Sequence, residues 1–311
     1  MSIHVLKQGL QTTVQDFGRP GYAHLGISTS GAADAFSFQI GNKLVGNDPH
    51  DAALEITLSG GEYEFTSDAC IALTGSEFNA SVDDEQVSIW TWTNIKKGQS
   101  LKIRSSYDGA RCYLCVRGGI DVPLLLNSRS THLMTGLGGF EGRALRKGNV
   151  LDTYQSGNNN SRVELINFNE IQKHLDRKTI RVIKTMVGDW FNVDGWDLFL
   201  NEKFTVSQSF SRMGIRLEGN HIQSSQGNEI LTQGVPLGAI QVPGSGNPII
   251  SFVEHQTTGG YPCIANVISA DLCRVGQLKP GDTFQFELVN FEAAEQLYNE
   301  QMKFIHNLSA S

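Results

Sequence analysis

Short apolar runs bounded by Gly and Pro are the main pattern in the second half of the chain. The clearest are residues 239–242, 248–253 and 263–269, which are rich in Val, Ile and Phe. Such runs predict buried β-strands, and the alternating segment 179–185 predicts another. The stretch 230–270 is long enough to cross a bilayer, but its prolines would break a helix there. We therefore expect strands and no membrane span.

Helical patterns are few. Asp34 can cap a helix that extends to Leu44, with apolar residues spaced four apart on one face. Residues 194–199 predict a short helix. Residues 290–306 predict a C-terminal helix that is capped by Asn290. The rest of the chain is expected to form strands and turns.

Composition narrows the class of protein. Charged residues make up 18% of the chain and Gly accounts for 33 of 311 residues, which fits a β-rich fold with many turns. Lys and Arg number 25 against 32 Asp and Glu, with no basic stripe, so we expect no nucleic-acid partner. The start of the chain has no secretory pattern and the cysteines number five. A reducing, cytoplasmic setting is the simplest interpretation.

Metal binding is not expected. Cys112 and Cys115 lie in a predicted strand, where residues three apart point to opposite faces. A zinc site would need a turn at this point and a second pair of ligands.

Two related β units are expected. A Gly-containing turn before an apolar strand recurs at 97–101, 147–151 and 280–284. Residues 155–162 are polar and predict a surface linker. We therefore predict an N-terminal β-barrel unit over 1–160, a C-terminal β-barrel unit over 178–289, and a helix within 290–311.

The stretch 230–270 is also the first candidate site, because Glu254 is its one formally charged residue. An isolated acid is costly to bury, so Glu254 must lie at a rim or be paired. Next to it, the segment 256–260 offers an amide, two hydroxyls and two glycines, which suit an amide or lactam ligand. The alternative is a Gly-Gly hairpin turn whose polar groups cap strand ends. Glu254, His255 and Asp271 are the nearby acid–base candidates.

Arginines supply the second set of candidates. Arg129 lies among hydroxyl residues, where its planar fork could hold a carboxylate or phosphate, and the glycines of 136–142 could form an anion nest. Asp16 and Arg19 are spaced for a local ion pair around a turn. Arg212 and Arg216 would share one strand face. In each case a purely structural arginine is the competing interpretation.

These motifs resemble the carboxyltransferase A/B-type family, formerly called allophanate hydrolase subunit 2, which includes KipA and the C subunit of bacterial 5-oxoprolinase. The resemblance extends from about residue 3 to 290. In the first half it is carried by segments 12–19, 30–34, 41–47, 73–75, 116–120 and 128–131 and by Glu55. In the second half it is carried by segments 212–219, 240–243, 256–262, 271–272 and 280–282. Two departures are Asn127, where Gly is usual, and Glu254, where Asp is usual.

The resemblance implies tandem cyclophilin-like β-barrels and a non-autonomous enzyme subunit. With a KipI-like B subunit and a LamB/YcsF-like A subunit, such a chain would open the lactam of 5-oxo-L-proline to L-glutamate with ATP. Biotin is not expected on this chain. The alternatives are the carboxyltransferase half of a biotin-dependent urea or amide carboxylase, and a KipA-like regulator that binds a KipI kinase inhibitor.

On this hypothesis the candidate residues fall into three roles. Glu254 or Asp271 is the acid–base candidate. Gln256, Thr257, Thr258, Gly259 and Gly260 would bind the amide. A carboxylate or phosphate would be held by Arg129 and Ser128, with Arg19 and Arg212 as further candidates.

Overall fold

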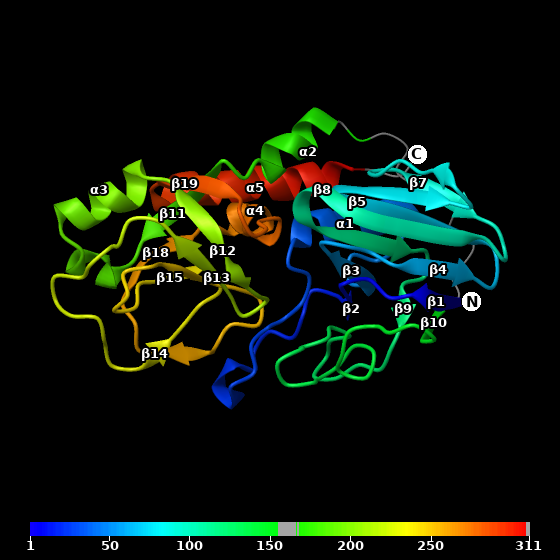
Figure 1. The fold of residues 1–311 in the computed structure, drawn as a ribbon, viewed down its shortest axis with the longest axis horizontal. Coiled ribbons are helices and arrows are strands. Elements are labelled where there is room, and N and C mark those ends of the chain that lie inside the picture. The colour runs from blue at the N-terminus through cyan, green and yellow to red at the C-terminus, as the bar shows by residue number, and fades with distance from the viewer. Residues whose placement is uncertain (155–165, 167, 309–311) are drawn as a thin grey trace. The chain divides into compact units, whose positions relative to one another are not determined.

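The computed structural model describes residues 1–154, 166 and 168–308 (Figure 1). The predicted linker 155–162 lies outside these residues. Contacts divide the chain into two compact units. Unit 1 comprises residues 1–19, 30–171 and 303–311, and unit 2 comprises residues 20–29 and 172–302. The units are interleaved in sequence: residues 20–29 belong to unit 2 although unit 1 residues flank them, and residues 303–311 belong to unit 1 although they follow unit 2.

Unit 1 is built on a ten-stranded sheet in which β8 is the central element. Its strands are β1 (Ser2–Lys7), β2 (Gln11–Gln15), β3 (Ala53–Thr57), β4 (Glu62–Phe65), β5 (Ala69–Val82), β6 (Glu85–Gln86), β7 (Trp92–Ile95), β8 (Ser100–Val116), β9 (Ile120–Asp121) and β10 (Val150–Thr153). The main path runs β2-β3-β8-β4-β1-β10-β9, and β5 pairs with β6, β7 and β8. Because β8 pairs with β4 through its first half and with β3 through its second, it bends the sheet around one core.

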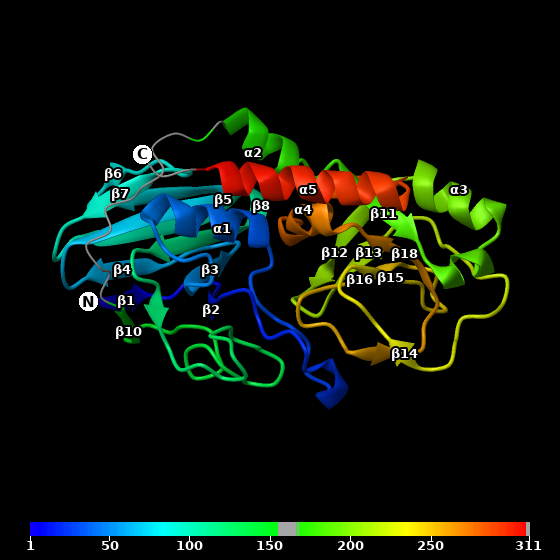
Figure 2. The ribbon, with the colours of Figure 1, turned by 180° about the vertical axis from the view of Figure 1, so that it is seen from behind.

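Helix α1 (Ala35–Val45) packs on β5 and β8, as Figure 2 shows. The Asp34 carboxylate accepts a hydrogen bond from the backbone N–H of Ser37 at 2.9 Å, and the helix ends at Gly46 in a left-handed conformation. Thr74 on β5 donates to the carbonyl of Ser37 at 2.8 Å. The predicted helix and its cap are confirmed.

Unit 2 contains a closed barrel with the strand order β11-β18-β15-β16-β13-β12-β19. The strands are β11 (Thr179–Lys184), β12 (Phe204–Phe210), β13 (Gly214–Glu218), β15 (Ala239–Gln241), β16 (Ile249–Ser251), β18 (Cys263–Val267) and β19 (Thr283–Leu288). Phe199 stacks on Phe286 with ring centroids 4.4 Å apart, and both contribute to the apolar filling of this unit. Strands predicted from the apolar runs correspond to β15, β16 and β18, and the alternating segment to β11.

A separate two-stranded sheet of unit 2 is formed by β14 (Gln233–Gly234) and β17 (Thr258–Gly259). Gln233 pairs with Gly259 and Gly234 pairs with Thr258. We refer to this pair of short strands as the flap.

The helical elements outside α1 are short, apart from α5. They are η1 (Ala23–Leu25), α2 (Phe168–Leu175), η2 (Met186–Trp190), α3 (Val193–Asn201), η3 (Ser269–Asp271), α4 (Leu272–Gly276) and α5 (Phe291–Asn307). Asn290 caps α5 by accepting from the backbone N–H of Ala293 at 2.9 Å. The predicted helices at 194–199 and 290–306 are therefore confirmed, whereas α2 was missed because its charged sequence contains one buried residue, Ile171.

The predicted mainly β fold with two tandem barrel units is confirmed. Unit 2 closes its barrel, and unit 1 bends its sheet around a single apolar cluster. Among the helices that the structure describes, none is both long and apolar enough to span a membrane.

Candidate functional site

The residues of unit 1 that were singled out from the sequence converge on one buried carboxylate, Asp16. Its Oδ1 accepts hydrogen bonds from the N–H of Gly18 at 2.7 Å and from the hydroxyls of Ser128 and Ser130 at 2.7 and 2.5 Å. Its Oδ2 accepts from the backbone N–H of Arg129 at 2.6 Å. Four donors on one carboxylate fix its position and the path of the chain through 128–130. Asp16 therefore positions Arg129.

A tight turn precedes this anchor. Leu126 and Asn127 both have positive φ, at 53° and 59°. The N–H of Leu125 donates to the carbonyl of Ser128 at 2.9 Å, and the N–H of Ser128 donates back at 3.2 Å. This is the pattern of a type I′ turn, and Asn tolerates the left-handed region better than most residues. Asn127 can thus replace a Gly at this position without losing the turn.

Arg129 is half-buried and lies over an aromatic ring. Its guanidinium carbon lies 5.2 Å from the ring centroid of Tyr154, and its Nη2 donates to the Tyr154 hydroxyl at 3.0 Å. Its buried Nε makes no hydrogen bond to any residue that the structure describes. The side chain is held in one orientation while a donor remains for a further acceptor.

Arg19 is only 1% exposed and supports the same region from the interior. Its Nη2 donates to the carbonyl of Ser130. Gly138 lies directly against it, since a Cβ at that position would come within 2.6 Å of this Nη2. In this conformation Arg19 braces the loop that carries Ser128 and Arg129. A direct contact between Arg19 and a ligand stays a prediction.

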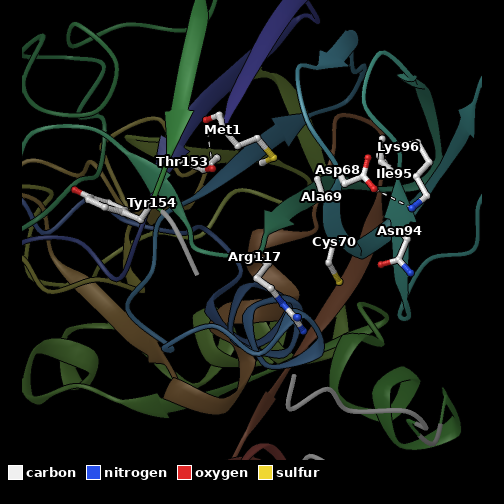
Figure 3. A pocket seen from close by; sticks show the side chains of 10 residues that line it. All are labelled: Met1, Asp68, Ala69, Cys70, Asn94, Ile95, Lys96, Arg117, Thr153 and Tyr154. Carbon is white, nitrogen blue, oxygen red and sulfur yellow. Dashed lines mark hydrogen bonds and ion pairs between the residues drawn. The ribbon is translucent and has the colours of Figure 1, made fainter. Parts of the chain in front are cut away.

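Tyr154 also lines a cavity of about 500 Å³ in unit 1, shown in Figure 3. Its cations have protein partners: Lys96 pairs with Asp68 at 2.9 Å, and Nε of Arg117 donates to the carbonyl of Val45 at 2.7 Å. None of its lining residues was a candidate from the sequence alone. Tyr154 links this cavity to Arg129.

In unit 2, Glu254 is buried and paired, one of the two arrangements expected for an isolated acid. Its Oε1 accepts from Nε of Arg212 at 2.5 Å, and the two side chains are 1% and 4% exposed. The backbone N–H of Glu254 also donates to the carbonyl of Arg212 at 2.8 Å. The ion pair ties the residues just before β13 to the residues that follow β16. The roles of Glu254 as acid–base group and of Arg212 as ligand contact stay predictions.

The Asp271 carboxylate is fully buried and forms ion pairs with two arginines. Its Oδ2 accepts from the backbone N–H and Nε of Arg181 at 2.7 and 3.0 Å. Its Oδ1 accepts from Nη2 of Arg181 at 2.5 Å and lies 3.2 Å from Nε of Arg274. This geometry makes Asp271 an anchor between β11 and α4. An acid–base role for it stays a prediction.

The segment 256–260 forms the flap and its approach. The N–H of Val235 donates to the carbonyl of Thr257 at 3.0 Å, and the N–H of Ile230 donates to the carbonyl of Gly260 at 2.8 Å. The main chain is therefore engaged, while the side chains of Gln256 and Thr258 are exposed. Because Gly259 pairs in a ladder, the segment is a short strand rather than a Gly-Gly turn. Its polar side chains stay available to a ligand.

His255 lies between the ion pair and the flap. Its Nδ1 is 2.8 Å from the carbonyl of Gln256. Since a carbonyl only accepts, Nδ1 carries the proton and Nε2 is the basic nitrogen. Burial lowers the pKa of His255, which favours the neutral ring.

Arg19, Ser128 and Arg129 thus lie together in unit 1, and Glu254, Arg212 and residues 256–260 lie together in unit 2. Sequence reasoning missed the contribution of Gln241, a buried glutamine on β15. The signal that could have found it is a single amide side chain inside an apolar strand. Among the residues that the structure describes, no group of three or more His, Cys, Asp and Glu side chains could hold a metal ion.

The Asp16 anchor generates the first prediction. Asp16→Ala removes a charged acceptor from four donors, and each such hydrogen bond contributes about 1.5–3 kcal/mol. We expect a loss of roughly 3–5 kcal/mol in the free energy of unfolding, measured by urea denaturation. The exposed Asp121→Ala is the matched control and should change stability by less than about 0.5 kcal/mol. Equal effects of the two substitutions would contradict the anchoring role.

The buried ion pair between Glu254 and Arg212 leads to the second prediction. Glu254→Leu or Arg212→Met alone leaves one buried charge unpaired, which costs about 3–5 kcal/mol. The double variant removes both charges and should recover most of that loss. A double-mutant cycle in urea checks this, and additive losses would show that the two side chains do not depend on each other.

The third prediction concerns how the stability of the protein depends on pH through His255. Because the pKa of His255 is lowered from 6.5 in the folded state, the unfolded state binds this proton more strongly. The contribution of His255 to stability is present above pH 6.5 and is lost as the pH falls through the lowered folded-state pKa. His255→Gln should remove this part of the decline when unfolding is followed from about pH 7.5 down to about pH 5. An unchanged pH profile in the variant would exclude His255 as its source.

Comparison with known proteins extends across both units. A family model described as "Carboxyltransferase domain, subdomain A and B" matches residues 25–288. The chain is 36% identical over 309 residues to the C subunit of 5-oxoprolinase from Escherichia coli, covering 99% of this chain and 97% of that protein. It is 36% identical to the protein of the same name from Haemophilus influenzae, covering 95% of this chain and 94% of that protein.

Fungal proteins of greater length contain a related region. The crystal structure of the Kluyveromyces lactis urea amidolyase is similar over the whole chain, with a TM-score of 0.92 and 32% identity, and the match spans 20% of that protein. The urea amidolyase of Saccharomyces cerevisiae is 32% identical over 100% of this chain and 18% of its own length. The chain therefore belongs to the carboxyltransferase subdomain A and B family.

Proposed function

We propose that this chain is the C-type subunit of an ATP-dependent 5-oxoprolinase, which opens the lactam of 5-oxo-L-proline to give L-glutamate. The observation that carries the proposal is the nearly end-to-end match to two proteins named as the C subunit of 5-oxoprolinase, with 97% and 94% of their lengths covered. In the urea amidolyase of Saccharomyces cerevisiae the corresponding region is only 18% of the protein.

The ligand chemistry supports the same conclusion. 5-Oxoproline carries a neutral lactam and one carboxylate. The exposed carboxamide of Gln256 and hydroxyl of Thr258 suit the lactam, because an amide side chain both donates and accepts. Considered by itself, Arg129 of unit 1, oriented by Asp16 and Tyr154, suits a carboxylate. In this proposal Ser128 holds the Arg129 segment in place, and Glu254 with Arg212 fixes the base of the flap.

The chemistry requires partners. A subunit of this kind works in a multi-subunit complex, and we propose a KipI-like B subunit and a LamB/YcsF-like A subunit as its companions. ATP would act within that complex, and no biotin would be attached to this chain. The five cysteines are all free and buried, which supports a reducing cytoplasmic location.

Among the three acid–base candidates, His255 is the one best prepared to move a proton. Its Nδ1–H is held by the carbonyl of Gln256, so that Nε2 can accept a proton at neutral pH. Glu254 and Asp271 both have arginine partners. His255 is therefore included in the proposed site beside them.

A second candidate function is transfer of a carboxyl group to urea or a related amide. It is favoured by the TM-score of 0.92 to the Kluyveromyces lactis urea amidolyase. Urea has no carboxylate, so Arg129 would then contribute little to substrate binding. A substitution of Arg129 therefore distinguishes the two candidate functions.

The experiment is ATP-dependent hydrolysis of 5-oxo-L-proline by the reconstituted complex. Arg129→Met should raise the KM for 5-oxoproline by about 10- to 100-fold, since a charge-assisted hydrogen bond contributes about 1.5–3 kcal/mol. Arg146→Met, an exposed arginine of the same unit, is the matched control and should behave as the wild type.

Two outcomes would overturn the proposal. One is a complex that hydrolyses 5-oxoproline equally well without this chain. The other is a complex that shows no 5-oxoproline hydrolysis but carboxylates urea when supplied with carboxybiotin, which would establish the second function.

A further inference from the structure

Gln241 is a buried polar residue that the fold does not satisfy. It is the last residue of β15 and is 4% exposed. Its Nε2 makes no hydrogen bond to any residue that the structure describes. Buried donors without an acceptor are rare in proteins, because the group loses its hydrogen bonds to water and gains none in return. An acceptor from outside the chain would complete it.

The carboxamide of Gln241 lies against the flap. A Cβ built on Gly259 would be 2.8 Å from Nε2 of Gln241, 2.8 Å from Nε2 of Gln256 and 3.0 Å from a methyl group of Val235. The φ of Gly259 is outside the left-handed region, so its backbone conformation is open to other residues. Glycine is needed here for space rather than for conformation. Two amide nitrogens thus lie close to a Cα that carries no side chain.

The surroundings of these two nitrogens are neutral. Val235, Ala239 and Cys263 form a small apolar cluster at the same place. Burial raises the pKa of the Cys263 thiol to about 11, so it stays protonated at neutral pH. The neighbouring Glu254 and Arg212 neutralise each other. Two neutral donors, of which that of Gln241 is buried, match a neutral acceptor with two lone pairs, which is a carbonyl oxygen.

We propose that Gln241 and Gln256 form a two-donor clamp over Gly259 that binds the carbonyl oxygen of an amide or lactam ligand. The inference deepens the proposed function, on which its choice of ligand rests. It assigns Gln241 as a specificity residue that the carbonyl contacts directly. Donors fixed at this oxygen would also polarise the carbonyl toward attack.

Stability gives a test that needs no ligand. Gln241→Leu keeps the size of the side chain and removes the unsatisfied donor. We expect the free chain to unfold at the same or a higher concentration of urea, because no hydrogen bond within the protein is lost. A purely structural role for Gln241 predicts the opposite. A clear decrease in the unfolding midpoint would overturn the proposal.

Binding to the reconstituted complex gives the second test, with 5-oxo-L-proline and L-proline as probes. L-Proline has the ring and the carboxylate but lacks the lactam carbonyl. Gln241→Leu and Gln256→Ala should each weaken binding of 5-oxoproline by about three- to tenfold and leave binding of L-proline unchanged. Equal affinity of wild type and both variants for 5-oxoproline would overturn the clamp.

Glycine substitutions supply the steric control. Gly259→Ala places a methyl group against both amide nitrogens and should weaken 5-oxoproline binding at least as much as Gln241→Leu. Gly234→Ala, across the same two-stranded ladder, meets nothing within 4 Å and should bind as the wild type does. Equal behaviour of the two alanine variants would argue against a ligand at Gly259.

The two hypotheses fail in different ways. If the wild-type complex binds no 5-oxoproline, the proposed function fails, and the stability of Gln241→Leu then decides the fate of the clamp. If the wild type binds 5-oxoproline and Gln241→Leu binds it equally well, the clamp fails and the proposed function stands.

Discussion

The hydrogen bonds of one buried carboxylate determine the geometry of unit 1 around its candidate site. Asp16 accepts from Gly18, Ser128, Ser130 and the backbone of Arg129, so the end of β2 and the loop after the 126–127 turn are held at a fixed separation. Arg19 braces the same loop, and Tyr154 supports the guanidinium of Arg129. The energetic cost of burying Asp16 is offset by these donors. Their effect is that one arginine is presented in a defined orientation.

In unit 2 the buried carboxylates, unlike Asp16, are paired with arginine side chains. Glu254 is paired with Arg212, and Asp271 is paired with Arg181 and Arg274, so both carboxylates have structural partners. The groups that remain available there are neutral: the carboxamides of Gln241 and Gln256, the hydroxyl of Thr258 and the imidazole of His255.

Local signals allowed helix α1 and several strands of unit 2 to be predicted from the sequence. Helix α1 has a cap at Asp34 and an apolar face, and β15, β16 and β18 are short apolar runs between turns. The candidate site could not be predicted in this way, because it depends on contacts between residues that are far apart in the sequence. Ser128 reaches Asp16 across 112 positions, and Arg212 reaches Glu254 across 42. The burial of Gln241 could not be predicted either, because the flap that covers it is assembled from residues 233–234 and 258–259.

In the proposed clamp, the neutral donors of Gln241 and Gln256 recognise an amide carbonyl beside the flap. This recognition is tested most directly by a crystal structure of the reconstituted complex with 5-oxo-L-proline bound. We predict that the lactam oxygen lies within hydrogen-bonding distance of the side-chain nitrogens of Gln241 and Gln256, beside Gly259. A ligand bound elsewhere, with the Gln241 amide still lacking an acceptor, would contradict it.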